Sequence, residues 1–256
     1  MGNIILKVED GIATITLSNP KRKNAMDQSM WISLRDLCTS ISNDATVRTI
    51  VITGQGNDFC SGADLSDPDS LTLDGLSRMR MIGDSILAVH RLNKPTFAVV
   101  KGVCVGAGMG LALACDIVYA ENSARFCEIF SKRGLAIDGG SSWLLPRLVG
   151  PQKAKEIAFF GEMISATEGF NMGFVNRVLE SDEIDEFVQT RVAAAAKLPT
   201  VAVSLTKTLI NHSFEASFES ALEDEARSQS LVFTTKDFAT AIKAFMEKSE
   251  PKFEGC

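Results

Sequence analysis

KPTFAVVKGVCVGAGMGLALACDIVYA, residues 94–120, contains two apolar runs separated by a stretch of small residues. The first run follows Pro95 and the second ends the segment, and both are typical of buried strands. Residues 106–114 between them are small and apolar throughout, which predicts a buried helix. A strand, a helix and a strand in this order indicate an α/β fold with crossover helices.

The same alternation continues on both sides of this segment. Further strand-like runs are GIATITLS (11–18), RTIVITG (48–54) and ARFCEIF (124–130). Apolar residues spaced three and four apart predict amphipathic helices over residues 26–41 and 77–92. From about residue 183 the strand patterns stop and helical patterns follow. We therefore expect an α/β core over residues 1–182 and a helical region over residues 183–256.

Composition argues against several classes of protein. The chain has 256 residues, of which 45% are hydrophobic and 23% charged, as in ordinary globular domains. Its net charge of −6 argues against a nucleic-acid partner. No run approaches the roughly 20 apolar residues of a membrane span. Since no leader pattern precedes the first strand-like run, we expect a cytoplasmic protein without a membrane partner.

Cysteines and histidines offer little material for a metal site. The six cysteines form no CxxC pair and most lie in apolar segments, so we expect reduced core residues rather than a disulfide or zinc framework. His90 and His212 are the only histidines, and each stands alone. The sequence therefore predicts no metal.

The glycines of residues 103–116 raise the possibility of a dinucleotide-binding loop. That motif needs G-x-G-x-x-G after a strand and an acidic residue about 20 positions later. Here Gly106, Gly108 and Gly110 bring the third glycine one place early, and Asp116 follows too soon. A dinucleotide-dependent oxidoreductase is therefore disfavoured.

A second interpretation pairs the glycines with NDFCSGADL, residues 57–65, which also follows a strand-like run. The small residues Ser61, Gly62 and Ala63 and the start of the 106–114 helix could each present a backbone N–H to one point. Two such groups form an oxyanion hole, and a helix N-terminus favours negative charge. Simple close packing of these small residues is the alternative at this stage.

Several segments together carry a family resemblance. NPKRKNAMD (19–27), DFCSGADL (58–65), residues 94–120, GEMISATEGFNMGFVNRV (161–178) and AFMEKSEPKFEG (244–255) resemble the crotonase, or enoyl-CoA hydratase/isomerase, superfamily. The resemblance implies a crotonase-like spiral of ββα units, then C-terminal helices that mediate trimers or hexamers built as dimers of trimers. It also implies an acyl-CoA substrate of fatty acid metabolism such as β-oxidation. Coenzyme A would enter as part of the thioester, without a separate cofactor.

The resemblance also assigns site residues. It implies an oxyanion hole formed by the N–H groups of Ala63 and Ala107. It implies that the following residues border the substrate or its CoA part: Lys23, Ala25, Ser61, Gly62, Asp64, Leu65 and Gly106. Phe245 and Lys248 match residues that reach CoA from the C-terminal helix, in some members across a subunit interface. Plain solvated charges remain the alternative for residues 21–23.

The acids of the usual hydratases are missing. Hydratases of this superfamily use two glutamates to hold and activate one water, a task that suits paired carboxylates. The matching positions hold Gly110 and Phe130, and Glu128 lies two residues from the second. A hydratase of the usual kind is therefore disfavoured.

Asp138, in GLAIDGGSSWLLPRLVG (134–150), is an acid in the right neighbourhood. Several isomerases of the superfamily carry an aspartate at this position, among them phenylacetate-pathway enzymes. One carboxylate in an apolar pocket can remove an α or γ proton and return it elsewhere. Phe130, Leu135 and Trp143 would make that pocket apolar. We therefore expect a proton-shifting enoyl-CoA or phenylacetyl-CoA-type isomerase.

Other interpretations stay open from the sequence alone. Asp138 could cap a helix instead of acting as a base, and Glu128 or Asp64 could take that part. A hydratase could hold its water with other groups. A non-catalytic acyl-CoA-binding subunit would also retain the oxyanion turns without the glutamates.

Overall fold

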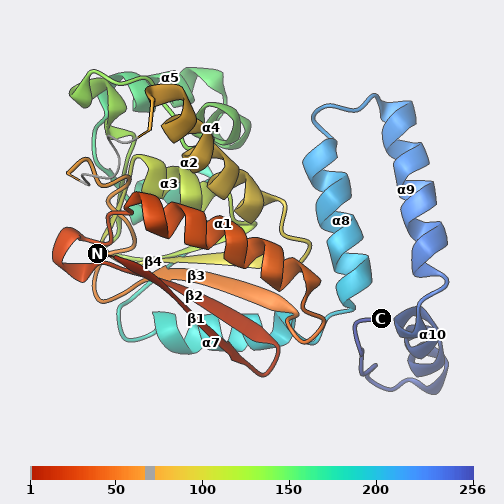
Figure 1. Cartoon of the computed structure of the whole chain (residues 1–256). Helices are drawn as coiled ribbons and strands as arrows, with labels where there is room; N and C mark the ends of the chain where they lie inside the picture. Colours follow the sequence, from red (N-terminus) through yellow and green to blue (C-terminus); the bar gives the residue numbers. More distant parts are fainter. Residues whose placement is uncertain (1, 67–72) are drawn as a thin grey trace.

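The computed structural model describes residues 2–66 and 73–256. It shows an α/β body with a group of helices from the C-terminal part of the chain beside it (Figure 1). The strands of the main sheet, in spatial order, are β1 (Asn3–Glu9), β2 (Ile12–Ser18), β3 (Thr49–Gly54), β4 (Thr96–Val100), β6 (Ile117–Glu121) and β9 (Arg177–Leu179). β1 pairs antiparallel with β2, and the other neighbouring strands run parallel.

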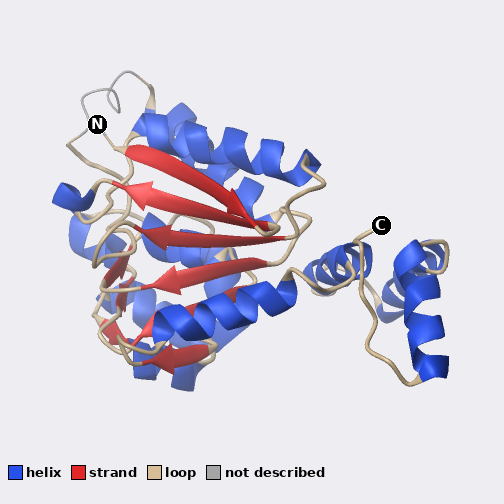
Figure 2. Ribbon diagram, turned by 90° about the horizontal axis from the view of Figure 1, so that it is seen from below, coloured by secondary structure: helices blue, strands red, loops and turns tan. Residues whose placement is uncertain are grey.

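Burial of the strands follows their place in the sheet. β2 buries Ala13, Ile15 and Leu17 at alternate positions, whereas all of β4 is buried. Parallel strands covered on both faces need such continuous apolar runs. Three helices, α1 (Gln28–Asn43), α2 (Gly75–His90) and α3 (Ala107–Leu113), lie on one side of the sheet, and α7 (Ile184–Ala195) lies on the other (Figures 1 and 2).

A second, smaller sheet consists of β5 (Val103–Val105), β7 (Arg125–Cys127) and β8 (Ile164–Ser165). The chain passes from β4 into β5 through a turn at Gly102, where a Cβ would overlap the carbonyl oxygen of Asn57. The order β4, β5, α3 is followed by β6, β7 and α4 (Ser141–Val149). These repeated strand–strand–helix units confirm the expected fold class.

The described body has further helices. They are α5 (Pro151–Phe160), α6 (Ala166–Met172) and the short 3₁₀ helices η1 (Pro20–Arg22) and η3 (Ile129–Arg133).

Side-chain caps fix where the two predicted amphipathic helices begin. Asp27 accepts a hydrogen bond from the N–H of Met30, and Asp74 accepts from the N–H groups of Leu76 and Ser77. Both predicted helices are confirmed, with bounds moved by about two residues.

The last three helices leave the body. They are α8 (Thr200–His212), α9 (Phe218–Val232) and α10 (Lys236–Glu247), and they stand beside it in both views (Figures 1 and 2). Within the described chain, α8 and α9 bury none of their residues. α7, in contrast, packs Ile184 and Val192 against Phe97 and Tyr119 of the sheet. The expected division at residues 182 and 183 stays a prediction, and the helices that leave the sheet begin with α8.

The described part of the chain also bears on the predictions about membrane spans, metal sites and cysteines. It has no helix long and apolar enough to span a membrane. Over residues 2–66 and 73–256, no three His, Cys, Asp or Glu side chains cluster as metal ligands would. The five cysteines other than Cys256 are buried, as predicted for core residues.

Candidate active site

Two turns from distant parts of the chain meet at the edge of the second sheet. The N–H of Cys60 donates to the carbonyl of Val103 at 2.9 Å, and the N–H of Val105 donates to the carbonyl of Cys60 at 2.9 Å. Residue 60 is thus bridged to β5 as a short parallel strand would be. The two chains turn side by side after this bridge.

Each turn depends on a glycine. Gly62 and Gly106 have φ angles of +97° and +56°, a region that residues with a Cβ rarely adopt. A Cβ on Gly62 would lie 2.9 Å from the carbonyl oxygen of Val105 and 3.5 Å from the nitrogen of Ala107. The turns are therefore in direct contact, and Ala63 and Ala107 directly follow the two glycines.

The N–H groups of Ala63 and Ala107 are both available to a ligand. Ala107 is the first residue of α3, where backbone N–H groups have no partner within the helix. Among the hydrogen bonds of the described residues, none is donated by either N–H group. Two free donors thus lie on adjoining turns, and an oxyanion hole requires two such donors.

The 19–27 segment holds the first turn in place. The N–H of Met26 donates to the carbonyl of Gly62 at 2.9 Å, and the N–H of Asp64 donates to the carbonyl of Met26 at 2.8 Å. These two bonds lie on either side of Ala63 and leave its own N–H free. The segment thereby fixes the direction of the turn.

Asn24 is a positioning residue that sequence reasoning missed. Its side chain is fully buried, and its Nδ2 donates to the carbonyls of Asp58 and Gln55 at 2.6 and 3.0 Å. Its Oδ1 accepts from the N–H of Asn19 at 2.9 Å. Asn24 also has a φ of +54°, which asparagine tolerates better than most residues. Its amide therefore ties the 19–27 segment to the loop that leads into residues 58–65.

The residues expected to border CoA lie along this junction. The N–H of Ser61 donates to the carbonyl of Lys23 at 3.0 Å, and its hydroxyl donates to the carbonyl of Arg22 at 2.9 Å. Ala25 is buried, whereas Lys23 and Leu65 are exposed. The structure therefore brings Lys23, Ala25 and Ser61 together, with the Lys23 side chain accessible to an anionic ligand.

Asp64 is engaged in an ion pair. Arg22 Nη1 lies 2.8 Å from both carboxylate oxygens of Asp64, and Ser66 donates to the same carboxylate. Burial acts to raise the pKa of Asp64, but hydrogen bonds from Ser66 and Arg22 hold it below the ordinary value. Asp64 is thus a stable anion and a poor candidate for the base.

Position 110 has no room for a side chain. Gly110 is fully buried, and a Cβ there would overlap the carbonyl oxygen of Gly139 and lie 2.9 Å from its carbonyl carbon. A Cβ on Gly139 would in turn lie 3.1 Å from the Cα of Ala107. The loop that carries Asp138 therefore packs directly against the first turn of α3.

Asp138 lies on this loop as a half-buried and unpaired acid. Its Oδ1 is buried and has no hydrogen-bond partner among the described residues. Loss of solvent raises the pKa of Asp138 to about 6, although the positive charge of Arg78 acts in the opposite direction. The N-cap of α4 is Gly140, and no described side chain caps that helix. Asp138 therefore does not act as a helix cap.

The apolar residues expected in the pocket have different surroundings. Phe130 is buried in η3, with a ring carbon 3.6 Å from where a Cβ of Gly106 would lie, so it stands beside the turn at Gly106. Leu135 is half exposed. The Trp143 ring packs against the guanidinium of Arg147, 3.7 Å from the ring centroid. Phe130 thus borders the candidate site, whereas Trp143 faces another part of the molecule.

A small cavity adjoins Ala63. Measured on the described residues, which omit 67–72, it has a volume of about 10 Å³. Its lining includes Met26, Trp31, Ala63, Asp64, Arg78, Met81 and Ile82. Residues 67–72, within the polar connection SDPDSLTLDGLS (66–77), lie outside the described residues. Among the described residues this space has room for about one water molecule, which is too little for an acyl group.

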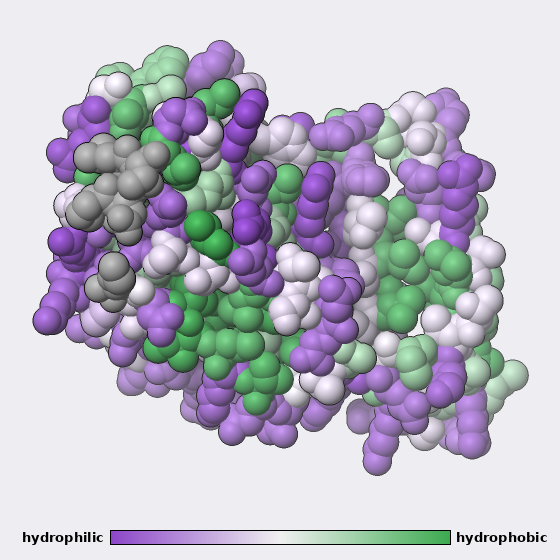
Figure 3. Space-filling view, in the orientation of Figure 1, coloured by the Kyte–Doolittle hydropathy of each residue, from purple (hydrophilic) through white to green (hydrophobic). Residues whose placement is uncertain are grey.

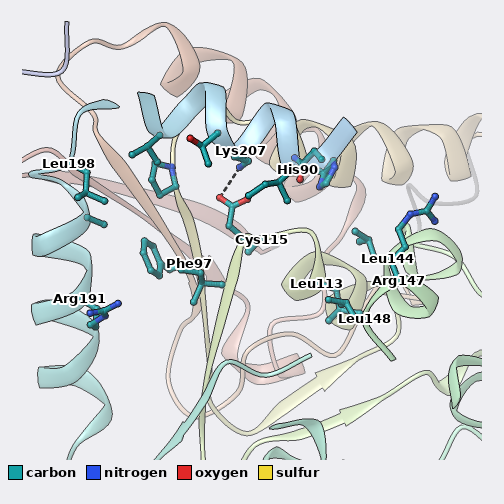
Figure 4. Close-up of a pocket in the computed structure, with 18 of the residues that line it drawn as sticks. His90, Phe97, Leu113, Cys115, Leu144, Arg147, Leu148, Arg191, Leu198 and Lys207 are labelled. Atoms are coloured by element: carbon teal, nitrogen blue, oxygen red, sulfur yellow. Dashed lines mark hydrogen bonds and ion pairs between the residues drawn. The ribbon is translucent and has the colours of Figure 1, made fainter. Parts of the chain in front are cut away.

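A much larger cavity lies between α8 and the body (Figure 4). It has a volume of about 630 Å³ and is lined by His90, Phe97, Leu144, Arg147, Leu148, Lys207 and other residues. Lys207 Nζ forms an ion pair with Asp116 at 2.9 Å on its wall. Ala63, Ala107 and Asp138 are not among its described lining residues. Its size alone does not make it the reactive site, because the free N–H groups and the unpaired acid lie elsewhere.

Phe245 and Lys248 lie far from the two turns within one chain. Phe245 is 80% exposed on α10, and Lys248 directly follows that helix. Figures 1 and 2 both place α10 in the separate group of helices, away from α3. A single chain therefore does not bring these residues to Ala63 and Ala107.

Glu128 is more deeply buried than its sequence context indicated. It is fully inaccessible, and neither carboxylate oxygen has a hydrogen-bond partner among the described residues. Burial raises the pKa of Glu128 to about 8. The one signal in the sequence was an acid within the otherwise apolar run FCEIF (126–130).

Known proteins similar to this chain share its full length. Residues 7–256 match the family model described as "Enoyl-CoA hydratase/isomerase". The chain is 34% identical to the 1,2-epoxyphenylacetyl-CoA isomerase of Escherichia coli K12, over 98% of each protein. It is 30% identical to the crotonyl-CoA hydratase of Syntrophomonas wolfei, over 98% of this chain and 97% of the relative. A crystal structure of an enoyl-CoA hydratase from Bacillus anthracis superposes with a TM-score of 0.93 at 28% identity, covering 99% of this chain and 100% of that one.

Proposed function

We propose that this chain, which belongs to the enoyl-CoA hydratase/isomerase family, moves a proton within an acyl-CoA substrate. One observation carries the choice of an isomerase. Position 110, where a hydratase glutamate would stand, is filled by the backbone of Gly139, while Asp138 stands unpaired on the same loop. The site thus offers one free carboxyl group beside two free N–H groups.

In the first step, the thioester carbonyl oxygen accepts hydrogen bonds from the N–H groups of Ala63 and Ala107. Asp138 then removes a proton from the α or γ carbon, and the electrons of that C–H bond move toward the carbonyl oxygen. The two N–H groups stabilise the resulting enolate or dienolate. A base with a pKa of about 6 is ionised at neutral pH and still able to hold the transferred proton.

In the second step, Asp138 returns the proton to another carbon and the double bond shifts. One carboxyl group serves both steps, and no water takes part. Phe130 beside the oxyanion turn keeps the site apolar. A 2- or 3-enoyl-CoA or a ring-modified phenylacetyl-CoA fits this chemistry, and the name of the Escherichia coli relative supports the second class.

The CoA part of the substrate would lie along the 19–27 segment. The exposed Lys23 side chain offers a cation for its phosphates. Phe245 and Lys248 would contact CoA from a neighbouring subunit, in a homotrimer or a hexamer. Exposed apolar residues on α8, on α9 and in the connection between them support such an assembly, among them Ile210, Phe214, Phe218 and Leu222.

Isotope exchange tests the proposal. The protein is incubated in deuterated water with 2-enoyl-CoA, 3-enoyl-CoA and ring-epoxide phenylacetyl-CoA, and the products are analysed by mass spectrometry and NMR. We expect deuterium at the α or γ carbon of at least one substrate, and its loss in Asp138→Asn. Rapid formation of 3-hydroxyacyl-CoA would overturn the isomerase in favour of a hydratase.

The same experiment distinguishes two other functions from the isomerase. The position of Glu128 close to Asp138 favours, as second candidate, a hydratase with an unusual pair of acids. Against it, Glu128 is fully buried and has no solvent-accessible surface. Tight binding of CoA esters with neither exchange nor hydration would indicate a non-catalytic acyl-CoA-binding subunit.

A further inference from the structure

Glu128 lies one residue from the anchor of the oxyanion turn. The carbonyl of the preceding residue, Cys127, accepts a hydrogen bond from the N–H of Gly106 at 2.8 Å. The chain then turns from β7 into η3, and the Glu128 side chain enters the interior with none of its surface accessible. The hydrogen bond between Gly106 and Cys127 therefore fixes the position of Glu128 as well as the turn at Gly106.

Three buried polar side chains without good partners gather here. Besides both oxygens of Glu128, the hydroxyl of Ser141 and Oδ1 of Asp138 are buried without a hydrogen bond of normal geometry to any described group. The Ser141 hydroxyl is nevertheless close enough to act on the Glu128 carboxyl group, and the charge of Asp138 also reaches it. Orphaned polar groups are rare in protein interiors, so such a cluster calls for a functional explanation.

The surroundings of the cluster favour one negative charge rather than two. An ionised carboxylate without a partner is costly to bury, whereas the neutral acid costs much less. Burial raises the pKa of Glu128 to about 8, and the negative charge of Asp138 raises it further while Ser141 lowers it. Burial raises the pKa of Asp138 to about 6, against the charge of Arg78 on α2.

The other titratable groups that act on Glu128 are neutral. They are the thiols of Cys104 on β5 and Cys127 on β7, and burial raises the pKa of both. Between about pH 6 and pH 8 the two acids therefore hold a single proton between them.

We propose that Glu128 is a positioning residue that acts through Asp138: it retains its proton while Asp138 is ionised, so that the site presents one negative charge, on the base, to the substrate. This inference rests on the proposed function and adds a second acid to its machinery. The arrangement separates two nearby carboxyl groups into a base and a neighbour that stays neutral while the base is ionised, as paired acids in enzymes commonly are.

The pH dependence of activity follows from this arrangement. Activity rises as Asp138 ionises near pH 6. It falls near pH 8 as Glu128 ionises, because a second negative charge then opposes the charge that develops on the enolate oxygen. Glu128→Gln keeps the shape but has no proton to lose, so its alkaline fall should be absent while the acid limb remains.

Thermal unfolding tests Glu128 without reference to catalysis. The folded-state pKa of Glu128 lies above its unfolded value, so its stabilising contribution is complete at low pH and is lost as the pH rises to about 8. Between pH 6.5 and 8, the melting temperature of the unmodified protein should fall relative to Glu128→Gln, by on the order of 5 °C. Glu162→Gln, on the exposed surface, should follow the unmodified protein.

The neighbours of Glu128 provide a second check. Ser141→Ala removes a group that lowers the pKa of Glu128, so the alkaline fall should move to higher pH. Asp138→Asn removes a charge that raises this pKa, so the fall in melting temperature over pH 6.5–8 should be smaller. If Glu128→Gln fails to fold, Glu128→Met offers a neutral side chain of similar length and the same expectation.

The outcomes separate this inference from the proposed function. Parallel melting curves for the unmodified protein, Glu128→Gln and Glu162→Gln would overturn the neutral Glu128, whatever the reaction. An alkaline fall in activity that persists in Glu128→Gln would overturn its action through Asp138. Absence of any proton exchange would overturn the isomerase, while the melting curves still decide the protonation of Glu128.

Discussion

At position 110 the chain has no side chain, and the space where one would begin holds the carbonyl group of Gly139. In our proposal, the choice between moving a proton and adding water therefore depends on backbone packing as much as on which acids are present. In the same proposal, Asp138 provides the base because its loop can approach α3 this closely. Its raised pKa comes from the same burial.

Gly110→Ala should destabilise the protein even though it adds one methyl group. The methyl would overlap Gly139, and overpacking of a rigid site costs about 1–3 kcal/mol or more. Gly83→Ala on α2 is the matched control, since a Cβ there meets no heavy atom within 4 Å. That variant should gain about 0.5–1 kcal/mol from helix propensity. Urea unfolding of both variants measures the difference, and equal stabilities would contradict the overlap.

Asp138→Asn should lose activity and gain stability at neutral pH. Loss of a general base typically costs a factor of about 10²–10⁴ in rate. The folded-state pKa of Asp138 is raised, so the stability it contributes is complete at low pH and is lost as the pH rises through about 6. Asparagine avoids that loss, so the variant should melt higher than the unmodified protein at pH 7 and not at pH 4. A lower melting temperature at pH 7 would contradict the unpaired carboxylate.

At the scale of elements, the site is a junction of turns held by backbone hydrogen bonds. The 19–27 segment, the turn at residues 61–63 and the start of α3 come from three separate crossovers. The local sequence explains each of these three segments separately. Only their contacts with one another leave the N–H groups of Ala63 and Ala107 free. Asn24 is the side chain that joins the first two.

Asn24→Ala should weaken this junction. Its loss leaves the carbonyls of Asp58 and Gln55 without their donor, at a cost of about 1–3 kcal/mol, and alanine tolerates the positive φ less well. Asn24→Gly removes the same hydrogen bonds but adopts that φ freely, so it should lose less stability. Chemical unfolding compares the two. If both variants match the unmodified protein, the amide does not hold the junction.

The sequence allowed most of these elements to be predicted, because strand and helix periodicity is a local property. The helix over residues 106–114 and the strands beside it are confirmed within a few residues. The contact between Gly110 and Gly139 was beyond such reasoning, since it joins residues distant in the chain. The same holds for Glu128, which is buried close to Ser141, the first residue of α4.

At the scale of the whole molecule, a single chain leaves apolar surface exposed on its C-terminal helices. In Figure 3, apolar side chains gather between α8 and α9 on the helices that stand apart from the body. Phe214, in the connection between these helices, and Phe218 and Leu231 of α9 are each more than half exposed. Apolar patches of this kind mark interaction surfaces, which supports the proposed trimer or hexamer.

Mixed oligomers should reveal sites shared between subunits. Neither Asp138→Asn nor Lys248→Ala alone should retain full activity, because one lacks the base and the other a proposed CoA contact. If Lys248 serves the neighbouring subunit, unfolding and refolding the two variants together should restore intact sites, about one in four in a randomly mixed ring. Activity of the mixture equal to the mean of the separate variants would contradict a shared site.

The contact between Gly110 and Gly139 also limits how this protein can evolve. Any residue larger than glycine at position 110 must displace the loop that carries Asp138 before its own side chain can contribute. Substitutions at positions 110 and 139 are therefore epistatic. A variant changed at position 110 alone would support neither proton transfer by Asp138 nor the addition of water. Among clones randomised at position 110 alone, selection for activity should return glycine. A change of reaction becomes accessible only when residues 138–140 vary together with it.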